Sequence, residues 1–457
     1  MTTGTLESPA DARRRPGRGP RGYPLVGVAP LAQRDPLSFF ERAARTYGDT
    51  VELNLAGQRV VMANRPDLVQ RVLQQNVEGY RKSKFYDRLK PMLGQGFLTS
   101  EGDTWLAQRR AAAPAFKGSA LAGMCRDMGA ATEETLARWQ PHADAGTSID
   151  VAEEMMRLTL DIAVRTLFGS RIPEATAHEL SGALAVVLRE AEARIWSIVN
   201  PPLWAPTPRG RAFRHAVRLM DGVFDDLIAR RRQDGPQGDL LDMLLEAYRE
   251  DPRMLRDLVV SILMAGHETT AAGLTWSFHL LGRNPQAAER VRAEAEEVLG
   301  DDPASAVGDM KTLQRLTYSR SVFEESMRLY PPIWTFSRDA LQDDRLGDSV
   351  VKAGDTVMIC AYAIHRDPDV WDAPEAFRPE RFLDDAPKRR HTYAYVPFGG
   401  GPRTCLGNRF AMTEAVIALA LAARCFELRH ADDAPVVPEP MITLRPRGGL
   451  RMVPRPV

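Results

Sequence analysis

The stretch that decides the fold lies near the C-terminus and reads Phe398-Gly399-Gly400-Gly401-Pro402-Arg403-Thr404-Cys405-Leu406-Gly407. Three consecutive glycines allow the backbone to approach a flat or bulky group closely. Cys405 follows them and precedes a helix predicted to begin near Asn408, where free N–H groups and the helix dipole favour the thiolate form. Such a thiolate is a nucleophile or a metal ligand. A buried structural cysteine is the usual alternative, and the combined Gly, Arg and Cys spacing argues against it.

The composition of the chain is that of an ordinary globular protein, with 457 residues, of which 44% are apolar and 26% charged. It excludes a chain that is disordered, collagen-like or coiled coil throughout. Sixty Lys and Arg balance sixty Asp and Glu, so the overall charge does not indicate nucleic-acid binding. The four cysteines (Cys125, Cys360, Cys405 and Cys425) form no CxxC motif and suit a reducing compartment. The basic N-terminus lacks the apolar segment of a signal peptide or membrane anchor, so we expect a cytoplasmic protein.

The pattern of apolar residues predicts a mainly α protein with small β sheets. Residues 1–22 are rich in Arg, Pro and Gly and are predicted to be a flexible tail, and residues 23–457 to be one large domain. Helices are predicted over 35–47, 66–75 and 408–424, and over most of 120–330 with breaks at 200–208 and 233–238. Strands are predicted over 50–64, where they form a hairpin, and over 346–360. Residues 366–404 are predicted to be mostly irregular.

The glycine-rich stretch resembles the haem-binding loop of the cytochrome P-450 family, F-G-x-G-x-R-x-C-x-G, at every fixed position. The resemblance implies the cytochrome P-450 fold. It also implies that Cys405 is the axial thiolate ligand of the iron in haem b (iron protoporphyrin IX), where electron donation by sulfur favours O–O cleavage. By the same resemblance Arg403 pairs with a haem propionate, Phe398 packs beside the sulfur, and Gly407 leaves room for the macrocycle.

A second motif, Ala265-Gly266-His267-Glu268-Thr269-Thr270, lies inside a long helix predicted from about Pro252 to Arg283. A carboxylate in an apolar helix costs free energy unless it is partnered, and the residues alone permit a kinked helix with a solvated Glu. The motif resembles the oxygen-activation groove of the family, [AG]-G-x-[DE]-T-T. That resemblance implies that Glu268 and Thr269 form the acid–alcohol pair that delivers protons during O₂ activation.

Two further residue pairs have spacings that place both members on one helical face. Glu325 and Arg328 form an E-x-x-R, which alone is most often a surface ion pair. The resemblance implies instead a buried structural pair, with Arg378 as the third member of its network. Trp105 and Arg109 form a W-x-x-x-R, which alone is most often a buried Trp with a solvated Arg. The resemblance implies a helix that binds the haem propionates.

The resemblance implies one more propionate contact and a pocket for substrate. Arg338, shortly after Tyr330-Pro331-Pro332, fits the propionate contact. The bulky apolar side chains among the predicted pocket residues favour an apolar substrate. The residues expected to line the pocket are Ala265, Ile333, Trp334 and Phe336, together with the loop near Ile442-Thr443 and other segments.

The leading hypothesis is a cytochrome P-450 monooxygenase, an oxidoreductase acting on paired donors. It would insert one oxygen atom of O₂ into an apolar small molecule by hydroxylation, epoxidation or multi-step oxidation, in secondary metabolism such as terpenoid or polyketide tailoring. No flavin or nicotinamide motif is present, so electrons would come from an external ferredoxin or flavodoxin with its reductase. The alternatives are a fatty-acid hydroxylase, a peroxide-driven peroxygenase, against which the Glu268–Thr269 pair argues, and a non-enzymatic haem sensor. We expect a monomer that binds no nucleic acid and has no membrane anchor.

Overall fold

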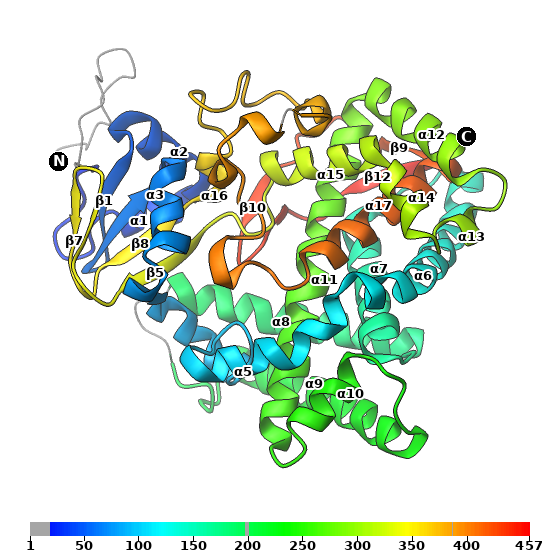
Figure 1. The fold of residues 1–457 in the computed structure, drawn as a ribbon, viewed down its shortest axis with the longest axis horizontal. Coiled ribbons are helices and arrows are strands. Elements are labelled where there is room, and N and C mark those ends of the chain that lie inside the picture. Colours follow the sequence, from blue (N-terminus) through cyan, green and yellow to red (C-terminus); the bar gives the residue numbers. More distant parts are fainter. Residues whose placement is uncertain (1–18, 197–200, 386) are drawn as a thin grey trace. The chain divides into compact units, whose positions relative to one another are not determined.

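The computed structural model describes residues 19–196, 201–385 and 387–457. The chain folds into two compact units, each built from separate stretches of sequence (Figure 1). Unit 1 comprises Met1–Asp87, Arg328–Phe377 and Asp384–Cys405, and unit 2 comprises Arg88–Met327, Arg378–Leu383 and Leu406–Val457. Most of the tail predicted over residues 1–22 lies outside the described residues, and the single domain predicted over 23–457 stays a prediction.

Unit 1 is built on a five-stranded sheet in the order β1-β2-β8-β5-β3. The first two strands form the predicted hairpin, in which Thr50 pairs with Ala63. Its turn residues Ala56 and Gly57 both have positive φ, as a two-residue type I′ turn requires. A separate two-stranded sheet joins β6 and β7. The strands of unit 1 are β1 (Thr50–Leu55), β2 (Gln58–Ala63), β3 (Tyr80–Lys82), β5 (Phe336–Ala340), β6 (Asp344–Leu346), β7 (Ser349–Val351) and β8 (Thr356–Ile359).

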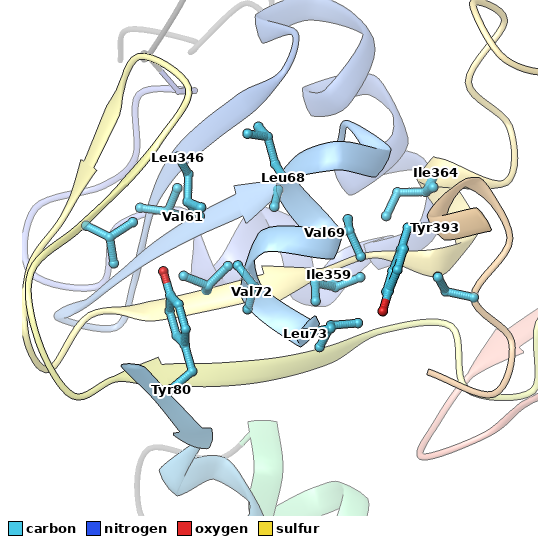
Figure 2. Packing of buried hydrophobic residues seen from close by; sticks show 14 of the residues in the cluster. Val61, Leu68, Val69, Val72, Leu73, Tyr80, Leu346, Ile359, Ile364 and Tyr393 are labelled. Carbon is cyan, nitrogen blue, oxygen red and sulfur yellow. The ribbon is translucent and has the colours of Figure 1, made fainter. Parts of the chain in front are cut away.

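The core of unit 1 lies where a short helical segment packs on this sheet (Figure 2). The helix α3 (Pro66–Gln70) continues into a π-helical turn, η1 (Arg71–Gln75), where the sequence predicted one uninterrupted helix. Val69, Val72 and Leu73 lie over Ile359 of β8, within one buried cluster. The other helical segments of unit 1 are α1 (Ala29–Arg34), α2 (Pro36–Tyr47), η2 (Val77–Gly79), α16 (Ala361–Ile364), η6 (Pro387–Arg389), η7 (Thr392–Ala394) and η8 (Gly401–Arg403), and η3 (Lys84–Leu89) and α15 (Thr317–Leu329) continue from one unit into the other.

Unit 2 is mainly helical, and its longest helix, α11 (Pro252–Arg283), has the predicted bounds. The predicted break at 233–238 separates α9 from α10, and residues 201–207 of the predicted Pro-rich break are non-helical. Among the residues that the structure describes, no helix is long and apolar enough to cross a membrane. The other helical segments of unit 2 are α4 (Lys90–Leu93), α5 (Gly102–Ala112), η4 (Ala113–Phe116), α6 (Gly118–Ala145), α7 (Val151–Phe168), α8 (Glu174–Trp196), α9 (Pro208–Asp234), α10 (Leu240–Ala247), α12 (Pro285–Leu299), α13 (Pro303–Ala306), α14 (Met310–Arg315), η5 (Pro379–Phe382) and α17 (Asn408–Cys425).

The C-terminal part of unit 2 forms two small sheets for which the sequence analysis predicted no strands. Prolines interrupt the alternating pattern there, which weakens the sequence signal for a strand. One sheet has the order β4-β12-β9, and the other is the hairpin β10-β11. These strands are β4 (Ile149–Asp150), β9 (Phe426–His430), β10 (Pro438–Pro440), β11 (Leu444–Pro446) and β12 (Arg451–Pro456). The prediction of a mainly α protein with small β sheets is confirmed.

The helix α15 carries Glu325 and Arg328, and both side chains are fully buried. In unit 2, Glu325 Oε1 accepts a hydrogen bond from the backbone N–H of Arg378 at 2.9 Å and pairs with Nε of Arg381 at 3.3 Å. The surface ion pair that the spacing alone permits is therefore excluded. Arg381, which the sequence analysis did not single out, supplies its guanidinium to the carboxylate.

In unit 1 the guanidinium of Arg328 holds a loop together. It donates to the carbonyl oxygens of His365, Pro374 and Ala376 at 2.9, 2.6 and 3.0 Å and lies 5.1 Å from the ring centre of Trp371. A planar fork with several donors suits this task, because it reaches three acceptors at once. Arg328 is thus a structural residue of unit 1.

A different buried group, Glu414 on α17, has no such partners. Glu414 is 1% exposed, and neither of its carboxylate oxygens has a hydrogen-bond partner within the described part of the chain. Burial raises its pKa well above the ordinary 4.5, and the nearby Thr270 hydroxyl opposes this only in part. The neutral carboxylic acid is therefore favoured over a wider pH range than in an ordinary glutamate.

We predict that Arg328→Ala gives little folded protein. Removing one member of a buried charged network costs about 3–5 kcal/mol, since the remaining polar groups lose their donors. The yield of folded protein and its unfolding in urea measure the effect. Arg320→Ala serves as the control, because Arg320 lies on the same helix with a largely exposed side chain, and there we expect a change of less than about 0.5 kcal/mol. Equal behaviour of the two variants would contradict the structural role.

We predict that Glu414→Gln changes how stability depends on pH. As the pH rises above the ordinary pKa of 4.5, the unfolded chain ionises at this position while the folded chain stays protonated. The free energy of unfolding of the wild type then falls, by at most about 1.4 kcal/mol per pH unit, until the pH passes the folded-state pKa. The variant lacks this decline, and its advantage over the wild type should grow with pH in urea unfolding. Glu297→Gln, at an exposed position on α12, is the control, and parallel profiles for Glu414→Gln and wild type would refute the prediction.

Candidate active site

The loop from Phe398 to Cys405 in unit 1 is closed by its own backbone. The N–H of Cys405 donates to the carbonyl of Phe398 at 2.9 Å, and the N–H of Gly399 donates to that of Val396 at 3.1 Å. Gly399 and Gly401 have φ values of 70° and 66°, in the left-handed region that other residues rarely adopt. The loop conformation therefore requires glycine at both positions, and it ends in an exposed cysteine.

The surroundings of the loop explain its glycines further. A Cβ added at Gly401 would overlap the carbonyl oxygen of Leu73, at the π-helical turn η1, and one added at Gly400 would overlap the ring of Tyr393. A Cβ at Gly399 would meet no atom within 4 Å. The loop is therefore seated tightly on the core of unit 1 and borders open space at Gly399. Arg403 and Phe398 are half-buried in and beside this loop.

The segment that leads into the loop is fixed by His365. Its ring Nε2 accepts the N–H of Val396 at 2.9 Å, and its carbonyl accepts from Arg328 at 2.9 Å. The Arg328 network thus continues to Val396, whose carbonyl receives the N–H of Gly399. The position of Cys405 depends through these bonds on a buried arginine far away in the sequence.

Cys405 and Cys425 are exposed, whereas the other two cysteines are not. Cys125 and Cys360 are buried, and burial raises their pKa values to about 11 and about 12. Although Cys425 at the end of α17 is exposed, desolvation raises the pKa of its thiol, and the charge of Arg424 opposes this rise. A thiolate is the form that ligates metals, and burial disfavours it. An exposed sulfur on a glycine-rich loop with open space beside it fits the axial ligand of a haem.

In unit 2, the buried helix α11 has a partly accessible stretch at its middle. From Asp257 to Phe278 every residue is buried except Ala265, Gly266 and Thr269. Ala265 and Gly266 precede Thr269 by four and three residues, so both neighbour it on the surface of the helix. A Cβ added at Gly266 would meet nothing within 4 Å. This accessible face, defined by Ala265, Gly266 and Thr269, leaves space for a flat or small ligand beside an otherwise buried helix.

Side-chain hydroxyls donate to the helix carbonyls around this face. Thr269 Oγ1 donates to the carbonyl of Ala265 at 2.7 Å, and Thr270 Oγ1 donates to that of Gly266 at 3.1 Å. Such bonds compete weakly with the helical hydrogen bonds, although α11 stays α-helical throughout. The hydroxyl oxygen of Thr269 keeps its acceptor capacity on the accessible face.

Glu268, the neighbour of Thr269, is buried and engages a different part of unit 2. Its Oε1 accepts a hydrogen bond from Thr443 Oγ1 at 2.8 Å. Burial raises the pKa of Glu268, and this hydrogen bond and the positive charge of Arg445 oppose the rise. Glu268 and Thr269 therefore each have a partner of their own in this structure, and their joint role as an acid–alcohol pair stays a prediction. The sequence placed Thr443 near the substrate and did not identify it as the partner of Glu268.

Trp105 and Arg109 lie on one face of α5, as their spacing predicts. The guanidinium carbon of Arg109 is 5.7 Å from the ring centre of Trp105, and both residues are half-buried. On the buried side of the same helix, Gln108 donates to the carbonyl of Gln95 at 2.7 Å and accepts from Ser100 at 2.6 Å. These bonds tie α5 to the loop before it.

The same loop is tied to α11. The N–H of Gln95 donates to the Asp257 carboxylate at 2.9 Å, and a Cβ added at Gly94 would overlap that carboxylate. A Cβ at Gly96 would overlap the hydroxyl of Ser261. The Gly-Gln-Gly sequence at 94–96 was the available signal for this close approach. Asp257 and Gln108 are thus positioning residues that the sequence analysis missed.

The remaining predicted residues of unit 1 lie on and before β5. Nη1 of Arg338 donates to the carbonyl of Ser337 at 3.0 Å, and its guanidinium carbon lies 5.7 Å from the ring centre of Phe336. Trp334 is 3% exposed and packs on Phe40 with 6.1 Å between ring centres. The structure thus gives Trp334 a core contact. Its place in a substrate pocket, like that of the half-buried Ile333 and Phe336, stays a prediction.

Gly407 immediately precedes α17 in unit 2. A Cβ added there would lie 3.7 Å from the ring of Phe116, which is an ordinary contact. No described residue around it therefore demands glycine. The predicted reason, room for a haem macrocycle, remains a prediction about the bound state.

Comparison with known proteins covers almost the entire chain. The sequence model of the family described as Cytochrome P450 matches residues 17–452. Cyclooctatin synthase from Streptomyces melanosporofaciens is 35% identical over 99% of this chain and 98% of the relative. Cyclooctat-9-en-7-ol 5-monooxygenase from the same organism is 34% identical, over 94% and 93%. Pentalenene oxygenase from Streptomyces avermitilis is 30% identical over 94% of both chains. The glycine-rich cysteine loop, the accessible face of α11 and these matches together establish that the chain belongs to the cytochrome P450 family of monooxygenases.

Proposed function

We propose that this protein is a haem-thiolate monooxygenase in which Cys405 ligates the iron of haem b. The single observation that carries the proposal is the exposed Cys405 at the end of a loop whose backbone requires Gly399 and Gly401. Membership of the family implies a thiolate-ligated haem, O₂, a small-molecule substrate and redox partners. When bound, the haem supplies the activation of O₂ from which one oxygen atom passes to the substrate.

The residues proposed to hold the haem have side chains whose chemistry matches its parts. Cys405 supplies a sulfur ligand to the iron, and Phe398 is proposed to pack beside that sulfur. Guanidinium and indole N–H groups pair well with carboxylates such as the two propionates of a haem. Gly407 is proposed to leave room for the macrocycle. The residues proposed to bind the propionates are Trp105, Arg109, Arg338 and Arg403.

Glu268 and Thr269 are the residues proposed to handle protons. A buried carboxyl with a raised pKa can carry a proton closer to neutral pH than an ordinary glutamate, which suits a general acid. The hydroxyl of Thr269 stands on the accessible face of α11 and can accept a hydrogen bond there while it donates to the Ala265 carbonyl. We propose that Thr269 orders the proton-donating water or hydroxyl at this face and that Glu268 resupplies its protons.

We propose an apolar terpenoid-type alkene or alcohol, in secondary metabolism, as the substrate. The names of two relatives refer to oxygenation of pentalenene and of cyclooctat-9-en-7-ol, an alkene and an alkene alcohol. Apolar side chains with accessible surface, such as Ala265 in unit 2 and Ile333 and Phe336 in unit 1, support an apolar substrate. Electrons are proposed to come from a ferredoxin or flavodoxin with its reductase. The sparse cysteines support a cytoplasmic location.

The ligand assignment predicts a spectroscopic result. The ferrous–CO adduct of the wild type should show the strongly red-shifted Soret band of thiolate ligation, and Cys405→Ala should lose it because no sulfur remains to donate to the iron. Alanine variants of Cys125, Cys360 and Cys425 are matched controls that should keep the band. Retention of the band in Cys405→Ala would contradict the assignment.

The proton-handling assignment predicts a change in product yield. Thr269→Ala should consume electrons from the donor at a comparable rate but release them as H₂O₂, so the ratio of product to peroxide should fall several-fold. Thr275→Ala is the control, since Thr275 makes the same hydroxyl-to-carbonyl bond on α11, at 2.7 Å, at a buried position. Haem content and substrate binding should be unchanged in both. An unchanged ratio in Thr269→Ala would favour the peroxygenase or sensor hypotheses instead.

A further inference from the structure

We propose that Thr443, in the turn of the C-terminal hairpin, is a positioning residue that holds the carboxylate of Glu268 away from the accessible face of α11 and must release it before it carries a proton there. The proposal rests on the proposed function, in which Glu268 resupplies protons to Thr269. The new part of the proposal is that Thr443 controls the orientation of the Glu268 carboxyl.

The contact between the two residues is direct and enclosed. Thr443 Oγ1 and Glu268 Oε1 are 2.8 Å apart, and the residues are 2% and 6% exposed. Across residues 19–196, 201–385 and 387–457, Thr443 is the one hydrogen-bond donor to this carboxylate. A hydroxyl has a single hydrogen to donate, so this bond commits it to Glu268.

The hairpin that carries Thr443 is itself fixed to α11. Nε1 of Trp276 donates to the carbonyl of Leu444 at 2.9 Å. Within the turn, the N–H of Met441 donates to the carbonyl of Thr443 at 3.2 Å. The backbone at Thr443 and at the next residue is therefore held by bonds other than the one to Glu268. A backbone fixed in this way is expected of a residue that positions another.

Glu268 and Thr269 point in different directions from α11, which explains why Thr443 must release the Glu268 carboxyl. Consecutive residues of an α-helix project about 100° apart. Thr269 stands on the accessible face, whereas Glu268 is buried and faces the hairpin. Proton transfer requires the donor and acceptor atoms to come within hydrogen-bond reach, directly or through one water. The carboxyl therefore has to leave Thr443 before it can serve the face that carries Thr269.

Among the groups around Glu268, the hydroxyl of Thr443 has the most direct influence on the protonation of its carboxyl. Arg445 of β11 lowers the pKa of Glu268 by its charge, but its guanidinium contacts Glu439 at 3.5 Å and the sulfur of Met441 at 2.7 Å. His267, the adjacent residue of α11, is buried with its pKa lowered to about 4 and is neutral near pH 7. The helix α17 packs on α11 and brings the buried carboxyl of Glu414 to Thr270. The helix α7, which also packs on α11, presents the neutral hydroxyl of Thr159 to the carbonyl of His267 at 2.8 Å.

The test compares Thr443→Val, which keeps the shape and removes the donor, with Thr443→Ser, which keeps the donor. Infrared spectra of the haem-loaded full chain, recorded across pH, report the C=O band of protonated buried carboxyls. The bands are assigned by their loss in Glu268→Gln and in Glu414→Gln. We expect Thr443→Val to raise the pKa of Glu268 by about one pH unit, because a hydrogen bond to the ionised form is lost. Thr443→Ser should stay close to wild type.

The same shift should appear in the pH dependence of product formation. In Thr443→Val the alkaline limb should move up by the shift seen in the infrared titration, and Thr443→Ser should restore it. An unmoved infrared band, or a moved band with an unmoved activity profile, would overturn the positioning role. Thr443→Ala gives the same test if Thr443→Val folds poorly. The proposed function fails separately, if Glu268→Gln turns over substrate at the wild-type rate.

Discussion

The close approach of the backbone at Gly401 to the carbonyl of Leu73 is the contact on which the rest of the site depends. It is possible only because Gly401 lacks a side chain and adopts a left-handed conformation. Leu73 belongs to a π-helical turn whose apolar side chains are buried against the sheet of unit 1. Hydrophobic packing in that core therefore fixes the turn, and through it the loop that carries the sulfur atom of Cys405. The Arg328 network fixes the same loop from its other side, through His365 and Val396.

Unit 2 contains a long buried helix and two buried glutamates, Glu268 and Glu414, whose surroundings differ. Most of α11 is enclosed by apolar packing, which would ordinarily exclude carboxylates. Glu268 is compensated by one hydroxyl and a nearby positive charge, so small changes around it can alter its protonation. Neither carboxylate oxygen of Glu414 has a hydrogen-bond partner among the described residues. The nearby Thr270 hydroxyl opposes the rise of its pKa only in part, so its neutral form is favoured. A buried carboxyl with a raised pKa is suited to moving protons when it lies beside a reaction site.

Much of the fold could be predicted because its signals are local. The bounds of α11 follow from a proline at its start and an apolar pattern with helical period, and the hairpin follows from Ala56-Gly57 between two alternating segments. The π-helical turn at Arg71–Gln75 could not be predicted, since its residues have an ordinary helical pattern. Trp334 illustrates the limit for side chains: a bulky apolar residue near a site can line it or pack in the core, and the sequence alone did not reveal its contact with Phe40.

In the candidate site, too, some residues could be predicted from local motifs and others could not. Cys405 and the motif around Glu268 are recognisable because glycines, a cysteine and polar residues stand at fixed short spacings. Their partners come from distant parts of the chain and leave no local pattern. Thr443 is separated from Glu268 by 175 residues, and Arg381 meets Glu325 across a segment with no distinctive spacing. Tertiary structure alone brings these groups together, and it determines the protonation and orientation of the residues that the motifs reveal.

The Cys405 loop is proposed to present its sulfur to the iron of a haem. Iron K-edge X-ray absorption of the purified ferric protein can detect this bond, because the fine structure separates sulfur from lighter atoms in the first coordination shell. We expect one sulfur scatterer beside the porphyrin nitrogens in the wild type, and its replacement by oxygen or nitrogen in Cys405→Ser. A wild-type spectrum fitted by nitrogen and oxygen alone, or a sulfur scatterer that persists in Cys405→Ser, would contradict it.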